Sequence, residues 1–191
     1  MLILIQLTGA WVLLLLVLAV CAAGLLFLRH PRVSGLFHEH VPDRPKRRLF
    51  LASVSFFITF LGVRTLTFCI HHSLGPFHDI AMGGRHIHHL VWGILILLLV
   101  GYGWLVEIGD GSSAGSIVMG RLMALLYGAG AALTLDEFAL WLNLRDVYWA
   151  REGRASIDAV ILFGALLSIG VWGGPFLRAL AREALRLEGK Q

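Results

Sequence analysis

The sequence predicts an all-α polytopic transmembrane helix bundle of about five spans, with the N-terminus outside and the C-terminus cytoplasmic. Composition is the first reason, because 58% of the 191 residues are hydrophobic and only 15% are charged, whereas a soluble domain is roughly 45–50% apolar. The second reason is that the apolar residues fall into five long runs, and the third is that basic residues follow the first and the fifth run. We therefore expect a single integral membrane domain over residues 1–191.

The five apolar runs predict spans at approximately 2–28, 49–70, 88–107, 117–142 and 157–178. Most of them reach the roughly 17–25 residues that a helix needs to cross the hydrocarbon core. The first run has no basic segment before it and exceeds the ~7–15 apolar residues of a signal peptide, so we expect it to be retained. The alternative is a lipidation site at Cys21, although Val20 is an unfavourable residue before such a cysteine.

Basic residues set the predicted orientation, because Lys and Arg concentrate on the cytoplasmic side of membrane proteins. They follow the first run (Arg29, Arg32, Arg44, Lys46, Arg47 and Arg48) and the fifth run (Arg178, Arg182, Arg186 and Lys190). The net charge of +4 is thus interpreted as a topology signal, and no nucleic-acid partner is expected. The predicted location is the cell membrane, most simply the bacterial inner membrane, with lipids as partners and with a homo-oligomer or a protein partner left open.

Small residues recur within the fourth run. Ala124 and Gly128 lie four residues apart, and Gly130, Ala131 and Ala132 follow. Small side chains allow helix backbones to approach closely in lipid, where packing drives association. We expect this run to be an interior helix.

The charged residues inside the predicted spans include Arg64, Asp136 and Glu137. Each would cost on the order of 2.5–3.5 kcal/mol at the centre of an isolated span. On the predicted topology they fall in the outer half of the membrane. The same region holds further ionisable residues: His71, His72, His78, Asp79, His86, His88, His89, Asp146 and Asp158. The sequence therefore predicts a histidine and carboxylate cluster near the outer face.

Imidazole and carboxylate are ligands of zinc and iron, so one hypothesis is a transition-metal site. In a regular helix His86 and His89 share a face while His88 points away, so these two would bind the metal with His71, His72 or His78. Asp136 and Glu137 cannot both point the same way from a regular helix. One of them would complete the metal site as a ligand or act as the catalytic base, and the other would form a structural ion pair with Arg64.

Several of these residues also have purely structural interpretations. Thr134 and Glu137 match a capping box, which would mark a helix restart after the glycine-rich stretch. Ser156 and Asp158 resemble an N-cap and a dipole-complementing acid at the start of the fifth span. A structural interpretation of Asp146 is an interfacial charge cluster with Arg145, Arg151 and Arg154. The histidines on the cytoplasmic side, His30, His38 and His40, are expected to be solvated loop residues.

Two resemblances can be tested on the motifs. The stretch "HIHH" at 86–89 does not match the histidine boxes of membrane di-iron desaturases. Those boxes have two or three residues between the first histidine and the final histidine pair, whereas this stretch has one. The motifs "HIHHLVWG", "LDEFALWLNL", "DVYW" and "SIDAV" resemble small uncharacterised bacterial multi-pass integral membrane proteins over residues ~50–170. That resemblance implies a fold and no activity.

Three functional hypotheses follow, and the sequence does not decide whether the protein is an enzyme. The first is a metal-dependent enzyme that acts on a lipid-like substrate at the outer face, with Glu137 or Asp136 as base. The second is an ion, metal or proton transporter, since ionisable residues within spans often mark a conduction path. The third is a non-catalytic binding or assembly protein with a buried ion pair between Arg64 and an acid.

Overall fold

The computed structural model describes residues 2–41, 43–74, 81–82, 85–86, 88–145 and 148–172, without the side chains of residues 2–10, 81–82, 85–86, 169–170 and 172. The described chain is almost entirely helical. Its elements are α1 (Leu2–Phe27), α2 (Pro31–His40), α3 (Arg44–His71), β1 (Ala81–Met82), β2 (Arg85–His86), α4 (His89–Leu105), α5 (Ala114–Asp136), α6 (Phe138–Asn143), the 3-10 turn η1 (Arg151–Gly153) and α7 (Arg154–Trp172). The two short strands pair antiparallel. The predicted all-α class is confirmed apart from this strand pair.

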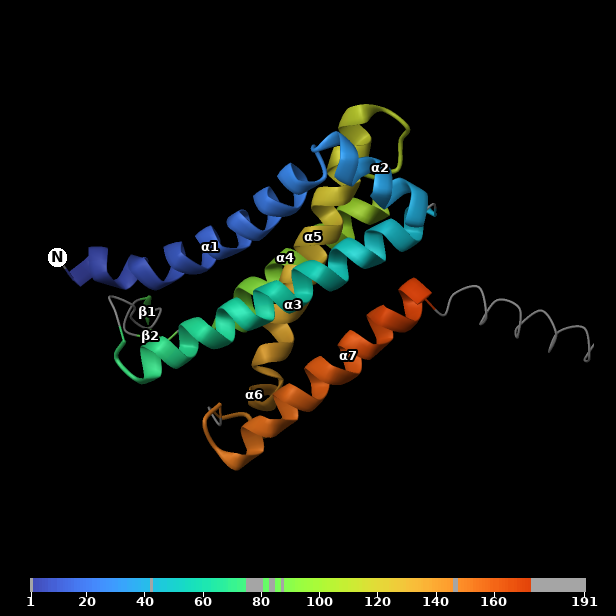
Figure 1. Ribbon diagram of the computed structural model, residues 1–191. Helices are drawn as coiled ribbons and strands as arrows, with labels where there is room; N and C mark the ends of the chain where they lie inside the picture. The colour runs from blue at the N-terminus through green and yellow to red at the C-terminus, as the bar shows by residue number, and fades with distance from the viewer. Residues whose placement is uncertain are drawn as a thin grey trace, which may run out of the picture.

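Helix α5 lies at the centre of the bundle. It packs against α1, α3, α4 and α7, and Figure 1 shows α3 between α1 and α7 with α5 passing behind it. Leu13, Val63 and Leu133 join α1, α3 and α5 in one apolar cluster. Phe56 and Val160 belong to a second cluster on the α7 side of the core.

Glycine allows α5 to approach its neighbours closely. A Cβ atom added at Gly128 would overlap the carbonyl oxygen of Ala52 in α3. A Cβ atom at Gly93 of α4 would lie 2.7 Å from the carbonyl oxygen of Gly130, closer than nonbonded atoms tolerate. Backbone contact on two sides is what small residues provide in a membrane bundle, and it makes α5 the interior helix of the described structure.

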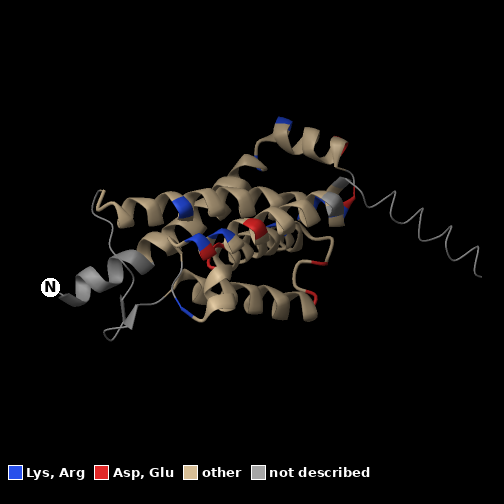
Figure 2. Cartoon of the chain, turned by 90° about the horizontal axis from the view of Figure 1, so that it is seen from below, with Lys and Arg blue, Asp and Glu red and all other residues tan. Residues whose placement is uncertain are grey.

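The distribution of polarity is the reverse of that in a water-soluble domain. Leu99 of α4 is 71% exposed and Leu162 of α7 is 72% exposed, whereas Asp136 is completely buried. Figure 2 shows Lys, Arg, Asp and Glu at a few positions along helices made otherwise of other residue types. Large apolar side chains exposed along several helices indicate a surface that faces lipid. The structure therefore indicates a membrane protein.

Two helices of the described chain, α3 and α5, are long and apolar enough to cross a membrane. A third candidate consists of Trp11–Phe27 of α1 together with α2, which are bent by 87° at the break between them. Helix α4 is apolar but shorter. These criteria give two to three candidate spans, so the five predicted spans and their orientation stay predictions.

Three element boundaries differ from the sequence prediction. The basic connection after α1 contains helix α2 instead of a solvated loop, and Pro31 suits its first position because proline has a helix-compatible φ and no N–H to satisfy. The span expected at 88–107 begins at His89, since the backbone of His88 is extended. The span expected at 117–142 is interrupted at Glu137, whose φ of −107° and ψ of 24° end α5.

We predict that Gly128→Ala destabilises the protein, because the new methyl group would force α3 and α5 apart. Overpacking of this kind costs about 1–3 kcal/mol. Gly101→Ala in α4 is the matched control, since nothing lies within 4 Å of its added Cβ and alanine favours a helix. Unfolding of the detergent-purified variants would measure both effects, and equal loss of stability in the two variants would contradict the close approach at Gly128.

Candidate functional site

The carboxylate of Asp136 is completely buried at the C-terminal end of α5 and contacts three other segments. Arg64 Nε of α3 lies 2.5 Å from Oδ1, and His89 Nε2, at the start of α4, lies 3.0 Å from Oδ2. The Tyr148 hydroxyl donates to Oδ2 at 2.8 Å. Both carboxylate oxygens therefore have cationic or hydrogen-bonding partners, as a buried carboxylate requires.

Glu137 binds the beginning of α4. Its Oε1 accepts a hydrogen bond from His88 Nδ1 at 2.7 Å, and its Oε2 accepts one from the backbone N–H of Leu90 at 2.9 Å. His88, the N-cap residue of α4, makes no side-chain cap of its own. Glu137 thus satisfies an otherwise unpaired N–H of α4 from the junction of α5 and α6 and places negative charge at the positive end of the α4 dipole. We refer to Arg64, His88, His89, Asp136, Glu137 and Tyr148 as the Asp136 network.

The end of α5 at Asp136 explains why both neighbouring acids can join one network. Glu137 is not helical, so its side chain departs from the angular spacing that a regular helix would impose. As a result His89 Nε2 faces Asp136, and His89 Nδ1 lies 3.5 Å from Glu137 Oε2. The expectation that Asp136 and Glu137 cannot point the same way was wrong, because it assumed an unbroken helix.

The same reasoning failed for the histidines. We expected His86 and His89 to share a helical face and His88 to point away. His86 lies in strand β2, and α4 begins only at His89. The extended backbone of His88 turns its side chain toward Glu137, so the described structure brings together His88 and His89.

Tyr148 is a member of the network that the sequence analysis missed. Its hydroxyl lies 2.9 Å from Thr67 Oγ1, and the Arg64 guanidinium carbon lies 4.4 Å from the centre of its ring. Burial raises the pKa of Tyr148, and the Asp136 charge raises it further, so the hydroxyl stays protonated and donates. The only sequence signal is a tyrosine close to the end of a span that contains an acid, which equally fits an interfacial aromatic.

The remaining predicted site residues lie apart from this network or outside the described residues. His71 is exposed and stacks on the ring of Trp149 at 4.3 Å, while His72 contacts Phe68. Asp158 is exposed on α7. His78, Asp79, Asp146 and the side chain of His86 are outside the described residues.

The described residues do not support the predicted metal site. Among them, no group of three or more His, Cys, Asp or Glu side chains could hold a metal ion. His88 and His89 each direct a ring nitrogen at a carboxylate oxygen. The two imidazoles therefore act as partners of the acids in the described geometry.

Ser156 has a different structural role from the predicted N-cap of the fifth span. Helix α7 begins earlier, at Arg154, and Ser156 is buried. Its hydroxyl oxygen accepts a hydrogen bond from the backbone N–H of Ala139 at 2.9 Å, in the first turn of α6. Ser156 thus caps a neighbouring helix. The alternative interpretation of Thr134 and Glu137 as a capping box does not hold, because Thr134 lies within α5 and is not an N-cap residue, although a new helix does begin at Phe138.

Comparison with known proteins does not indicate an activity for this chain. No protein-family model, curated protein or solved structure matches the chain. This result is consistent with the resemblance to a family of no known activity.

We predict that Glu137→Ala destabilises the protein by about 1–2 kcal/mol, the usual effect of losing a helix cap. The loss should be smaller in Glu137→Gln, because a side-chain amide oxygen can still accept from Leu90. Glu152→Ala is the control, because the Glu152 side chain is exposed and its ion pair with Arg145, which is also exposed, is long at 3.8 Å. Thermal unfolding in detergent measures all three, and a Glu137→Ala variant as stable as the control would refute the capping role.

Proposed function

We propose that this chain is a five-span membrane protein that acts as a non-catalytic binding or assembly component. The observation that supports this proposal is that the carboxylates of Asp136 and Glu137 bind donors of the same chain. A general base or a metal ligand must present an oxygen or nitrogen to a substrate or a metal. Asp136 instead faces Arg64, His89 and Tyr148, which favours a structural role for the acids over catalysis.

Helix lengths support five spans. The five long helices α1, α3, α4, α5 and α7 contain 26, 28, 17, 23 and 19 residues. At about 1.5 Å per residue they extend about 26 to 42 Å, compared with a hydrocarbon core of about 30 Å. The basic start of α3 would then face the cytoplasm, and the Asp136 network would lie near the outer face.

The energetics of lipid favour the Asp136 network as a clamp between helices. An isolated charge within a span is costly, so Arg64 and Asp136 stabilise the arrangement in which α3 and α5 meet. His89 adds α4 to the same contact, and Tyr148 adds the segment before α7. These four segments are held together at one end of the bundle, where Trp141 and Trp149 are exposed. Exposed tryptophans suit both the lipid interface and a protein partner.

We predict that Arg64→Leu and Asp136→Leu each lower the free energy of unfolding by about 3–5 kcal/mol, because each leaves one buried charge without its partner. The double variant should fold and be more stable than either single variant, since neither charge is then left uncompensated. Chemical unfolding in detergent measures all three. Size-exclusion chromatography would show whether each variant remains a single species.

The exposed pair of Arg145 and Glu152, whose nitrogen and oxygen lie 3.8 Å apart, is the matched control. Replacing either residue by leucine should change stability by no more than about 1 kcal/mol. If Arg64→Leu and Asp136→Leu were as stable as the parent, the structural role would be wrong. One transition metal bound per purified chain, and lost in His89→Ala, would instead favour the metal-dependent enzyme.

The five-span topology predicts alternating accessibility of the connections. A membrane-impermeant maleimide added to intact cells should label Leu74→Cys and Ala150→Cys, which lie at the end of the bundle that carries the Asp136 network. It should label Gly35→Cys and Ser112→Cys only after the membrane is permeabilised. All four positions are in connections or in the short helix α2.

The labelling needs a background in which the two native cysteines, Cys21 and Cys69, are replaced by alanine. The cysteine-free chain provides the blank. Labelling of Gly35→Cys or Ser112→Cys from outside would reverse the orientation. Labelling of Leu74→Cys but not Ala150→Cys would reduce the number of spans.

A further inference from the structure

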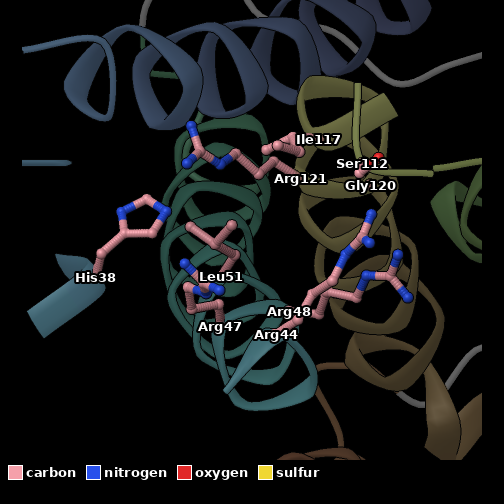
Figure 3. A pocket seen from close by; sticks show the side chains of 9 residues that line it. All are labelled: His38, Arg44, Arg47, Arg48, Leu51, Ser112, Ile117, Gly120 and Arg121. Atoms are coloured by element: carbon pink, nitrogen blue, oxygen red, sulfur yellow. The ribbon is translucent and has the colours of Figure 1, made fainter. Parts of the chain in front are cut away.

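A cavity of about 370 Å³ lies at the end of the bundle opposite the Asp136 network, between α2, α3 and α5. Its volume is within the roughly 300–1,000 Å³ of small-molecule pockets. The charged and polar residues that line it are His38, Arg44, Arg47, Arg48, Ser112 and Arg121, and no acidic side chain belongs to the lining. Figure 3 shows the guanidinium groups of Arg44 and Arg48 together on the side of Gly120 and Ser112, and those of Arg47 and Arg121 nearer to His38. The cavity is therefore strongly basic.

Two of the four arginines hold the wall of this cavity. Arg44 donates to the carbonyl oxygens of Gly109, Asp110 and Gly111. Arg48 donates to the Gly109 carbonyl at 2.8 Å and pairs with the Asp110 carboxylate at 2.5 Å. The connection between α4 and α5 is thereby attached to the start of α3.

Gly109 and Gly120 make this attachment possible. Gly109 has a φ of +87°, a conformation that favours glycine. A Cβ atom added at Gly120 would lie 2.9 Å from the Gly109 carbonyl oxygen and 3.2 Å from a nitrogen of Arg48. The wall is thus built closely around the two paired arginines, and their charges are directed at the protein itself.

The other two arginines have no such partner. Within the described residues, neither Arg47 nor Arg121 has an acidic or hydrogen-bonding partner for its guanidinium, and both are partly buried. Two partly buried cations that share a cavity repel each other, and an anion bound between them would offset this repulsion. His38 donates its Nδ1 proton to the Ser34 carbonyl at 2.7 Å, so only Nε2 of its ring remains for another partner.

We propose that this cavity binds a phosphate group, carried by either an anionic membrane lipid or a free phosphate. Guanidinium groups bind phosphate oxygens in a planar, two-pronged geometry, which suits Arg47 and Arg121. Ser112 lines the cavity just before α5 begins at Ala114, so the positive end of the α5 dipole adds to the attraction. A basic pocket at the end of membrane helices is also where lipid headgroups lie.

The test is direct binding to the full-length protein in a neutral detergent. One arm titrates inorganic phosphate, and the other titrates short-chain phosphatidic acid with phosphatidylcholine of the same chain length as the reference. Arg47→Gln and Arg121→Gln should each weaken binding about tenfold or more, because each removes charge-assisted hydrogen bonds. Isothermal titration calorimetry measures the change.

The control is Arg29→Gln together with Arg32→Gln, which removes two exposed charges near the same end but outside the cavity. It should bind as the parent does. Specific binding in the phosphatidic acid arm alone identifies the lipid headgroup as the source, and binding in both arms identifies a general phosphate site. Absence of binding in both arms, or equal binding by the parent and the Arg47→Gln and Arg121→Gln variants, overturns the proposal.

A fold control separates lost binding from lost structure. Without ligand, Arg121→Gln should be at least as thermally stable as the parent, because it removes one of two like charges from a shared cavity. A folded Arg121→Gln variant that binds phosphatidic acid and phosphate as tightly as the parent would exclude this cavity as the site. The stability of the Arg64→Leu and Asp136→Leu variants does not bear on this result.

Discussion

The contact between Arg64 and Asp136 is the constraint on which one end of this bundle depends. Asp136 is completely buried, and an unpaired carboxylate in such a place would be strongly unfavourable. The guanidinium of Arg64 can reach it only if α3 and α5 lie close together, and Gly128 permits that approach because its lack of a side chain leaves room for the Ala52 carbonyl. Small-residue packing and the ion pair therefore both hold α5 against α3. Neither explains the position of α5 alone.

Hydrogen bonds between helices extend this constraint to the helix ends. In an apolar environment the free N–H groups of a helix start cannot rely on water. Glu137 accepts from the start of α4, and Ser156 accepts from the start of α6. Both acceptors lie on other elements. The starts of α4 and α6 thus depend on the correct placement of a neighbouring segment, which couples these helices at this end of the bundle.

The sequence predicts most of the helices and the participants in the network, but not its geometry. Apolar runs indicate α1, α3, α4, α5 and α7, because burial in lipid requires long apolar helices. Arg64, Asp136, Glu137 and His89 stand out because charge within a span needs compensation. The break at Glu137 and the extended backbone at His88 occur where both side chains make tertiary contacts, and helical periodicity does not predict either. Those two departures bring both acids and both histidines together.

The two ends of the bundle use the same kinds of side chain to different effect. At the Asp136 network, donors and carboxylates of the chain satisfy one another, so the charge there stabilises the fold. At the basic cavity, Arg44 and Arg48 are satisfied by the α4–α5 connection, whereas the lining offers Arg47 and Arg121 no acid. The predicted orientation explains why basic residues gather at this end, but it does not explain why two partly buried cations share one cavity. A ligand that supplies the missing negative charge does, which is why the unbalanced end of the molecule is the better candidate for recognition.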